Sequence, residues 1–208
     1  VKSNGYHLNT GFLYTPFLCK VLAEYGYIEA DKRIEDVDFD RPFEECRGIG
    51  MSFGFNKNED VADYLSAKEL IEMLCDLVSK GGNFLLNIGP AADGTIPVIM
   101  EERLLQMGDW LRVNGEAIYG TRIWSKKLQE GVYYTKKGDD VYAIINRFPF
   151  GSQLLELVDY DPAMKAELLG SNAALEIRDN GGKAEIVFPA INPDSIDSNW
   201  LYTIKLSK

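Results

Sequence analysis

The sequence has one histidine, His7, and no CxxC pair among its 208 residues. A zinc site built on thiolates would need paired cysteines, and a histidine-based metal site or a Ser-His-Asp triad would depend on His7 alone. We interpret the three widely spaced cysteines, Cys19, Cys46 and Cys75, as buried free thiols. The sequence therefore predicts neither a metal nor another cofactor.

Basic residues are also in the minority. The chain has 22 Lys and Arg against 32 Asp and Glu, giving a net charge of −10. Because nucleic-acid-binding surfaces are usually basic, we expect no nucleic-acid partner. No run of about 18 apolar residues occurs, so we expect no membrane-spanning helix. The remaining composition, 46% hydrophobic and 26% charged, is that of a globular protein of one or two domains.

Residues 42–114 alternate between strand and helix patterns. Residues 46–55 read as a strand that runs into a loop, and residues 83–88 form a continuous apolar run. Such a run is typical of a parallel strand covered on both faces. Between them, Ser66 and Glu69 form a capping box at the start of a helix that Gly81-Gly82 ends.

A second helix is expected to begin near Pro97, with Thr95 as a candidate cap, and to end at Asn114-Gly115. The order strand, helix, strand, helix is typical of a βα-barrel. In such a barrel the loop after residues 83–88 would lie at the active-site end. A turn is the natural role of Asp93-Gly94 in that loop.

After Trp124 the pattern changes to short strands separated by turn signals. Such spacing predicts an antiparallel β-sandwich, with a domain boundary near Ser125. The predicted strands are 132–134, 141–146, 154–158, 184–188 and 201–206, and the turns lie at 137–140, 180–182 and 192–194.

Four segments stand out as motifs: residues 43–56 (FEECRGIGMSFGFN), 64–70 (YLSAKEL), 83–97 (NFLLNIGPAADGTIP) and 114–122 (NGEAIYGTR). Together they resemble glycoside hydrolase family 29, the α-L-fucosidases. Residues 43–56 resemble that family's WE-C-x-(S)-W/F-G-Y-N segment, and residues 64–70 resemble the helix that follows it. Residues 83–97 are similar to GNLLLNIGPxADGTIP, and residues 114–122 resemble the tail that closes the barrel. The similarity is dense from about residue 42 to 124 and weaker in the sandwich.

The resemblance implies an enzyme: a retaining exo-α-L-fucosidase that acts on fucosylated glycans. It implies residues 1–124 as the C-terminal portion of a (β/α)8 barrel and residues 125–208 as a β-sandwich domain. A retaining glycosidase uses two carboxyl groups about 5–5.5 Å apart, one as nucleophile and one as acid/base. In this family the nucleophile is an Asp on an upstream strand and the acid/base is a Glu in a TPEYG-like setting.

Glu24, in the segment Leu22-Ala23-Glu24-Tyr25-Gly26, is our candidate acid/base, and Asp31 is the second choice. Phe53 matches the aromatic residue that lines the family's fucose pocket, where an aromatic face suits the apolar patch around the C5 methyl. We interpret Asn87 as structural. The same holds for two further carboxylates, Glu44 and Glu45. The family's NDRWG arginine has no counterpart near Val1–Tyr6, so no arginine is assigned.

The number of βα units raises a question of completeness. A (β/α)8 barrel takes about 250 residues, whereas residues 1–124 can hold about three units. Residues 1–23 contain no Asp that could act as the nucleophile. We therefore expect this chain to be the C-terminal part of an α-L-fucosidase and to be inactive alone.

Two other interpretations stay open. The sandwich could belong to a non-catalytic carbohydrate-binding or structural module, although its aromatic residues alternate as core residues do. Gly89–Gly94 could cradle a phosphate before a helix, but it lacks the usual glycine spacing. Members of the family are commonly secreted, periplasmic or lysosomal. The sequence indicates neither a compartment nor an oligomeric state.

Overall fold

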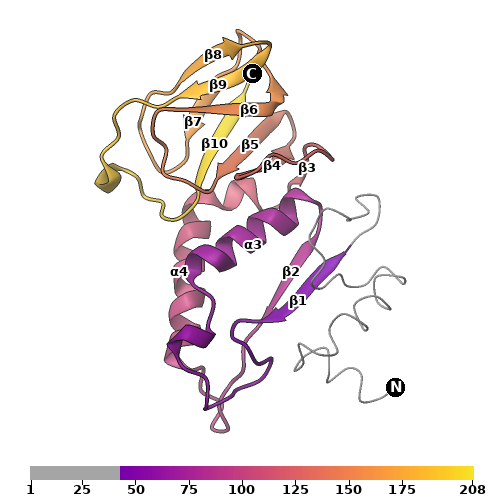
Figure 1. Ribbon diagram of the computed structural model, residues 1–208, viewed down its shortest axis with the longest axis vertical. Coiled ribbons are helices and arrows are strands. Elements are labelled where there is room, and N and C mark those ends of the chain that lie inside the picture. The colour runs from indigo at the N-terminus through magenta and orange to yellow at the C-terminus, as the bar shows by residue number, and fades with distance from the viewer. Residues whose placement is uncertain (1–42) are drawn as a thin grey trace. The chain divides into compact units, whose positions relative to one another are not determined.

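The computed structural model describes residues 43–208, which are drawn in colour in Figure 1. The chain divides into two compact units at Met107/Gly108. The sequence interpretations for His7, Cys19, Glu24 and Asp31 lie outside the described residues. The first unit holds a parallel strand pair and a helix. The second holds two antiparallel sheets. Helix α4 (Val98–Asn114) begins in the first unit and ends in the second.

The first unit contains strands β1 (Glu44–Gly48) and β2 (Asn83–Asn87), joined through helix α3 (Ala67–Ser79). The strands are parallel, with Glu44 opposite Asn83 and Gly48 opposite Asn87. Strand β1 is therefore shorter and earlier than the expected strand over residues 46–55. From Ile49 onward the chain bends into a loop, which a short 3-10 helix, η2 (Val61–Asp63), follows.

Helix α3 begins and ends where the sequence predicts. The Ser66 hydroxyl accepts a hydrogen bond from the Glu69 N–H at 3.3 Å, and the Ser66 N–H donates to the Glu69 carboxylate at 2.8 Å. Each side chain thus accepts a hydrogen bond from a backbone N–H that the first turn of the helix would leave without a partner. Of the cysteines, Cys75 is a buried free thiol as predicted, and burial raises its pKa. Cys46 is free but only half-buried.

Strand β2 is less buried than its apolar sequence predicts. Asn83 and Leu85 are exposed, with 42% of the Leu85 surface accessible. Within residues 43–208, β2 pairs with β1 alone. The expectation of a strand covered on both faces is therefore wrong for the described part of the chain. A second sheet neighbour and a second covering layer would be needed to bury Leu85.

Helix α4 starts one residue later than expected. The Pro97 carbonyl accepts from the N–H groups of Met100 at 2.9 Å and Glu101 at 3.0 Å, which makes Pro97 the residue before the helix. The Thr95 hydroxyl, our expected cap, instead donates to the Asp93 carboxylate at 2.7 Å. The helix ends at Asn114, as predicted, and a short 3-10 helix, η3 (Gly115–Ala117), follows.

The second unit holds two antiparallel sheets. One has the strand order β3-β4-β5-β10-β7 and the other β6-β9-β8. A 3-10 turn, η4 (Pro193–Ser195), precedes the last strand. The strands are β3 (Arg122–Ile123), β4 (Val132–Lys137), β5 (Asp140–Ile145), β6 (Ser152–Asp159), β7 (Lys165–Leu168), β8 (Glu176–Asn180), β9 (Lys183–Val187) and β10 (Tyr202–Ser207).

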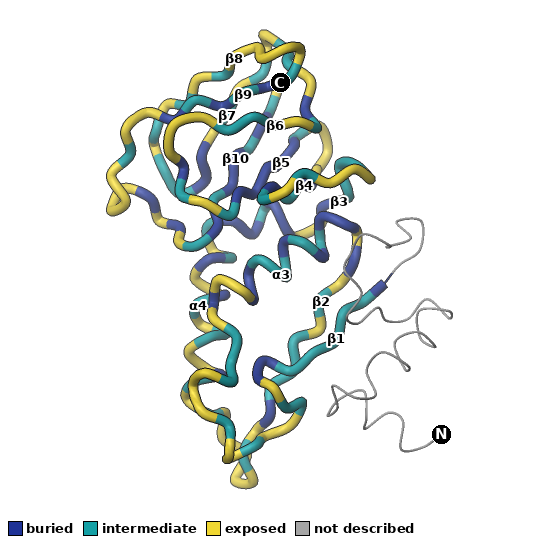
Figure 2. The backbone as a smooth tube through the Cα atoms, in the orientation of Figure 1, coloured by how far each residue is buried: buried dark blue, intermediate teal, exposed yellow. Residues whose placement is uncertain are grey.

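One hydrophobic core is shared by the two sheets. Alternate residues of β4, β5, β9 and β10 form the buried centre of this unit (Figure 2). Strand β6 adds Leu155 and Val158, which are three residues apart because the pairing of β6 with β9 shifts register there. Period-two alternation places every second side chain on the inner face of a regular strand. The core residues are Val132, Tyr134, Val141, Ala143, Ile145, Leu155, Val158, Ala184, Ile186, Phe188, Ile204 and Leu206.

The five strands predicted after Trp124 are present as β4, β5, β6, β9 and β10. Three strands, β3, β7 and β8, were not predicted. Strands β7 and β8 carry the sequences KAEL and EIRDN and lie at sheet edges. Charged residues are common on edge strands because they discourage pairing with other chains. A rule based on apolar alternation therefore misses them.

Candidate functional site

The candidate site lies where β1 and β2 end. Because the two strands are parallel, their last residues, Gly48 and Asn87, lie opposite each other at one edge. The chain continues from this edge into two loops, and the Ile49 N–H donates to the Asn87 carbonyl at 3.0 Å. In βα-barrels, loops that follow the strands at this end carry the catalytic and binding residues.

A hydrogen bond joins the two loops. The Asn87 side-chain N–H donates to the Phe53 backbone carbonyl at 2.5 Å, across 34 residues of sequence. This bond fixes the backbone at Phe53, whose side chain is half-buried. The structural role that we assigned to Asn87 is thus specific: it positions the residue that we expect to contact the sugar.

Hydrogen bonds from residues further along the same loop also hold the segment that carries Phe53. The Ser52 N–H donates to the Glu59 carboxylate at 2.5 Å, and the Asn56 side chain donates to the Ser52 hydroxyl at 3.0 Å. Burial and the neighbouring Glu59 carboxylate raise the pKa of Tyr64. Glu59 therefore acts on this loop as an acceptor for its backbone, and sequence reasoning did not single it out.

Gly89 brings the two loops into close backbone contact. A Cβ atom added at this position would lie 2.1 Å from the Phe55 nitrogen and 2.5 Å from the Gly54 carbonyl carbon. No side chain fits in that space, so only glycine allows this approach. The close contact and the hydrogen bond from Asn87 act on the same short segment, residues 53–55.

The segment Ala91–Thr95 forms a turn, as predicted. Gly94 has a φ of 86°, and the Asp93 carboxylate accepts from the Thr95 N–H at 3.0 Å. The hydrogen bonds from Thr95 lower the pKa of Asp93. Both hydrogen bonds from Thr95 are accepted by the same carboxylate oxygen, Oδ1, so the Asp93 side chain serves the turn itself.

Glu44 and Glu45 lie at the beginning of β1, at the opposite end from Phe53. A strand rises about 3.3 Å per residue, so Glu44 stands roughly 13 Å from the strand's last residue. Burial raises the pKa of Cys46, and the two carboxylates raise it further. This position is remote from the candidate site and agrees with the structural role that we expected for both residues.

Comparison with known proteins identifies the family. The family model described as "Alpha-L-fucosidase" matches residues 17–116, and the model described as "Alpha-L-fucosidase C-terminal domain" matches residues 125–207. The α-L-fucosidase of Branchiostoma floridae is 38% identical over 170 residues. The plasma α-L-fucosidase of Homo sapiens is 37% identical over 178 residues.

The chain belongs to the α-L-fucosidase family.

Solved structures of this α-L-fucosidase family share the fold. The α-fucosidase of Thermotoga maritima, in complex with a mechanism-based inhibitor, has a TM-score of 0.71 at 32% identity. That match covers 87% of this chain and 42% of the other chain. The two curated relatives are matched over 79% of this chain but only 38% and 37% of their own lengths. The chain thus spans about two fifths of the α-L-fucosidases that it resembles.

A charged cluster lies in the second unit. Lys205 Nζ is 3.1 Å from a Glu116 carboxylate oxygen and 3.4 Å from an Asp140 oxygen, and it lies 5.7 Å from the centre of the Tyr142 ring. The Tyr142 hydroxyl donates to Glu116 at 3.1 Å, and the pKa of Lys205 is raised, chiefly by its hydrogen bond to Glu116. Each charge has an opposite partner, so the cluster ties η3 to β5 and β10.

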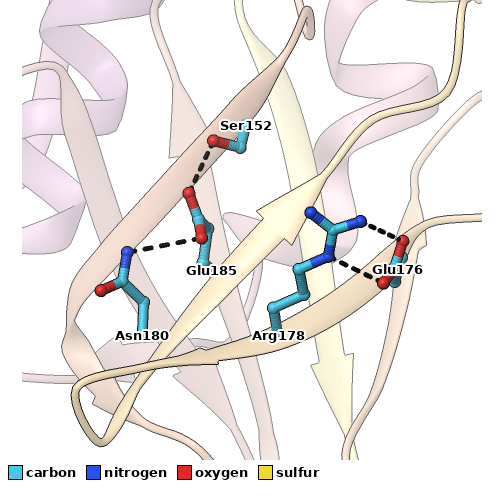
Figure 3. Close-up of polar contacts among 5 residues, drawn as sticks. All are labelled: Ser152, Glu176, Arg178, Asn180 and Glu185. Atoms are coloured by element: carbon cyan, nitrogen blue, oxygen red, sulfur yellow. Dashed lines mark hydrogen bonds and ion pairs between the residues drawn. The ribbon is translucent and has the colours of Figure 1, made fainter.

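The outer face of the three-stranded sheet is polar. Glu185 on β9 accepts from the Ser152 hydroxyl at 2.6 Å and from the Asn180 side chain at 3.4 Å (Figure 3). On β8, Arg178 donates two hydrogen bonds to Glu176 at 2.8 and 2.9 Å (Figure 3). Strands β6, β8 and β9 contain no aromatic residue. This sheet therefore offers no flat aromatic platform for a sugar.

Residues 43–208 contain no group of three or more His, Cys, Asp or Glu side chains that could hold a metal ion. Within the same range, no helix has both the length and the apolar character needed to cross a membrane.

Proposed function

We propose that this chain forms part of a retaining exo-α-L-fucosidase that removes terminal α-L-fucosyl residues from fucosylated glycans. The observation that carries the proposal is the hydrogen bond from Asn87 to the Phe53 carbonyl, which joins the two strand-end loops. Both family models that match the chain are α-L-fucosidase models. In βα-barrel enzymes the active site lies at the C-terminal ends of the parallel strands, and these two loops lie at such an end.

The proposed architecture has two parts. Residues 1–124 form the C-terminal portion of a (β/α)8 barrel, and residues 125–208 form an antiparallel β-sandwich. The parallel pairing of β1 with β2 supports the first part, and the core shared by two antiparallel sheets supports the second. The C-terminal domain match begins at residue 125, where we place the boundary.

Glu24 is the proposed acid/base of the reaction. It would protonate the leaving oxygen in the first step and then activate water to release the fucosyl group from the enzyme. The nucleophile would be an Asp on a strand that this chain does not supply. Without that second carboxylate no glycosyl-enzyme can form, so we propose that these 208 residues alone do not hydrolyse fucosides.

Phe53 is the proposed aromatic wall of the fucose site. A 6-deoxy sugar presents an apolar patch around its C5 methyl group, which an aromatic ring can cover. The hydrogen bond from Asn87 supports this assignment because it fixes the Phe53 backbone without using its ring. Removing the ring should weaken substrate binding more than it slows the chemical steps.

A chimera tests these assignments. It joins the upstream part of the Branchiostoma floridae α-L-fucosidase to this chain, and an aryl α-L-fucoside reports activity. We expect turnover by the chimera and none by the 208-residue chain. Glu24→Ala in the chimera should abolish most activity, azide should restore rate with an activated substrate, and Glu29→Ala should have little effect. Normal activity of the Glu24→Ala chimera would refute the acid/base role, and turnover by this chain alone would refute the need for an external nucleophile.

A further inference from the structure

A cavity of about 350 Å³ opens at one end of the two-sheet unit. Its floor is apolar and consists of core residues of both sheets, Val141, Val158 and Leu206. Its walls come from the end of β3, the β4–β5 turn, the segment after β6 and the end of β10. The volume falls within the range of about 300–1,000 Å³ that is usual for small-molecule sites. No step of the proposed hydrolysis uses this cavity.

Two aromatic residues line the cavity, and both are held in place by contacts made elsewhere. The Trp124 indole N–H donates to the Leu157 carbonyl at 3.0 Å, and the Tyr160 N–H donates to the Gly182 carbonyl at 2.9 Å. Tyr160 also lines a neighbouring cavity of about 330 Å³. The indole bond fixes the ring of Trp124, and the backbone bond fixes the main chain at Tyr160. A ring that is ordered before a ligand arrives binds it at a lower entropic cost.

The polar rim consists mainly of carboxylates whose charges are already compensated. Asp159 lies 2.6 Å from Lys183 Nζ, and Asp161 lies 2.7 Å from Lys208 Nζ. The hydrogen bonds from these lysines lower the pKa values of both carboxyl groups, which therefore stay ionised at neutral pH. A carboxylate has about four lone-pair positions, so each retains capacity to accept further hydrogen bonds. Asp139 completes the rim.

The charges of the rim select among ligand classes. Lys183 offsets the charge of Asp159, and Lys208, which itself lines the cavity, offsets that of Asp161. Neither an anion nor a cation would therefore gain much from these charges. A neutral ligand with many hydroxyl groups can donate to the carboxylates and place an apolar face against Trp124 and Tyr160. Sugars combine these two properties.

We propose that this cavity binds a neutral sugar residue of a glycan, at a site separate from the strand-end loops of β1 and β2. The site would hold a glycan to the C-terminal domain whether or not the chain takes part in hydrolysis. Carbohydrate binding of this kind does not depend on the proposed function, because Glu24 and Phe53 make no contribution to it.

Binding to the 208-residue chain tests the proposal. The three tryptophan indole N–H signals are recorded by NMR during titration with lactose, 2′-fucosyllactose or methyl α-L-fucoside, and Trp124→Phe identifies the signal of Trp124. We expect a saturable shift of that signal with at least one sugar. No saturable shift with any of the three would overturn the proposal, as would saturation by phosphate or tetramethylammonium in place of the sugars.

Variants locate the site. Tyr160→Ala should weaken binding at least tenfold, and Tyr160→Phe, which keeps the ring, should bind as the unmodified chain does. Phe150→Ala is the matched control, since Phe150 is 76% exposed and lies outside the cavity. Phe53→Ala should also leave this binding unchanged, which separates it from the proposed fucose site. Unaltered binding by Tyr160→Ala, or loss of binding by Phe53→Ala, would contradict the assignment.

Discussion

Asn87, the last residue of β2, donates a hydrogen bond to the backbone carbonyl of Phe53 in the loop after β1. The two residues lie 34 positions apart, and each belongs to a different βα connection. The bond makes the conformation of one loop depend on the end of the neighbouring strand. A sugar-contacting residue at position 53 would thus be held by the scaffold rather than by the ligand.

Asn87→Ala should loosen the Phe53 loop without unfolding the unit. The half-buried Phe53 carbonyl loses its donor, which costs about 1–3 kcal/mol when no water replaces it. Amide hydrogen exchange in residues 50–56 should become faster, whereas exchange in α3 should stay unchanged. Asn83→Ala is the control, because Asn83 is an exposed asparagine on the same strand. Equal exchange in both variants would show that the hydrogen bond does not order the loop.

Gly89→Ala should disturb the same loops, whereas Gly108→Ala should stabilise the chain. The Cβ at position 89 would lie 2.1 Å from the Phe55 nitrogen, so the loops must separate. At position 108, in the exposed middle of α4, a Cβ meets nothing within 4 Å. Alanine there should add about 0.8–1 kcal/mol of helix stability. Urea unfolding of both variants measures the difference, and similar stabilities would refute the close contact at Gly89.

Local chemistry explains the parts of the fold that the sequence could predict. Ser66 and Glu69 cap their own helix, and the strands of the two-sheet core alternate with a period of two. These signals need no knowledge of distant residues. The exposure of Leu85 and the charged strands β7 and β8 depend instead on which strands are neighbours. Sequence periodicity contains no information on that point.

The candidate site divides in the same way. Phe53 and Asn87 were each noticed from family-like motifs, but the hydrogen bond between them is a long-range contact that spacing alone cannot reveal. The sequence does not single out Glu59, because an acidic residue in a polar loop usually has its carboxylate in solvent. Its role becomes visible only when the Ser52 N–H is seen to donate to it. Glu24 lies outside the described residues, so its role stays a prediction.

Ser66→Ala should destabilise α3 by an amount that depends on pH. Hydrogen bonds from the Ser66 hydroxyl and N–H lower the pKa of Glu69. A lowered carboxyl pKa contributes stability above the ordinary value of 4.5, and this contribution is lost as the pH falls through the lowered value. Removing the cap should therefore cost about 1 kcal/mol near neutral pH and less in acid.

Urea unfolding near neutral pH and again below the ordinary pKa of glutamate measures this dependence. Ser66→Thr is the control, because threonine keeps the hydroxyl and should retain most of the stability. A cost that is the same at both pH values would show that Glu69 does not contribute through its charge. The N–H of Glu69 would then be the only group that the cap serves.

Trp110→Phe should lower the stability of the second unit modestly, and Trp110→Ala should lower it strongly. Trp110 is 1% exposed, and its indole N–H donates to the Leu201 carbonyl at 2.8 Å, across 91 residues of sequence. That carbonyl also accepts from the Ser198 hydroxyl at 3.0 Å, so it keeps one partner in the phenylalanine variant. The expected cost is therefore about 1 kcal/mol for Phe but about 3–5 kcal/mol for Ala, which also leaves a cavity.

Thermal unfolding followed by near-ultraviolet circular dichroism distinguishes the two effects. A loss of about 1 kcal/mol shifts the midpoint of a domain of this size by roughly 4–8 °C. Phe150→Ala removes an exposed aromatic from the same unit and should leave the midpoint nearly unchanged. If Trp110→Phe were as damaging as Trp110→Ala, the hydrogen bond to Leu201 would outweigh packing at the end of α4. We expect packing to be the larger effect. Burying the ring contributes more free energy than one hydrogen bond to a carbonyl that keeps a second donor.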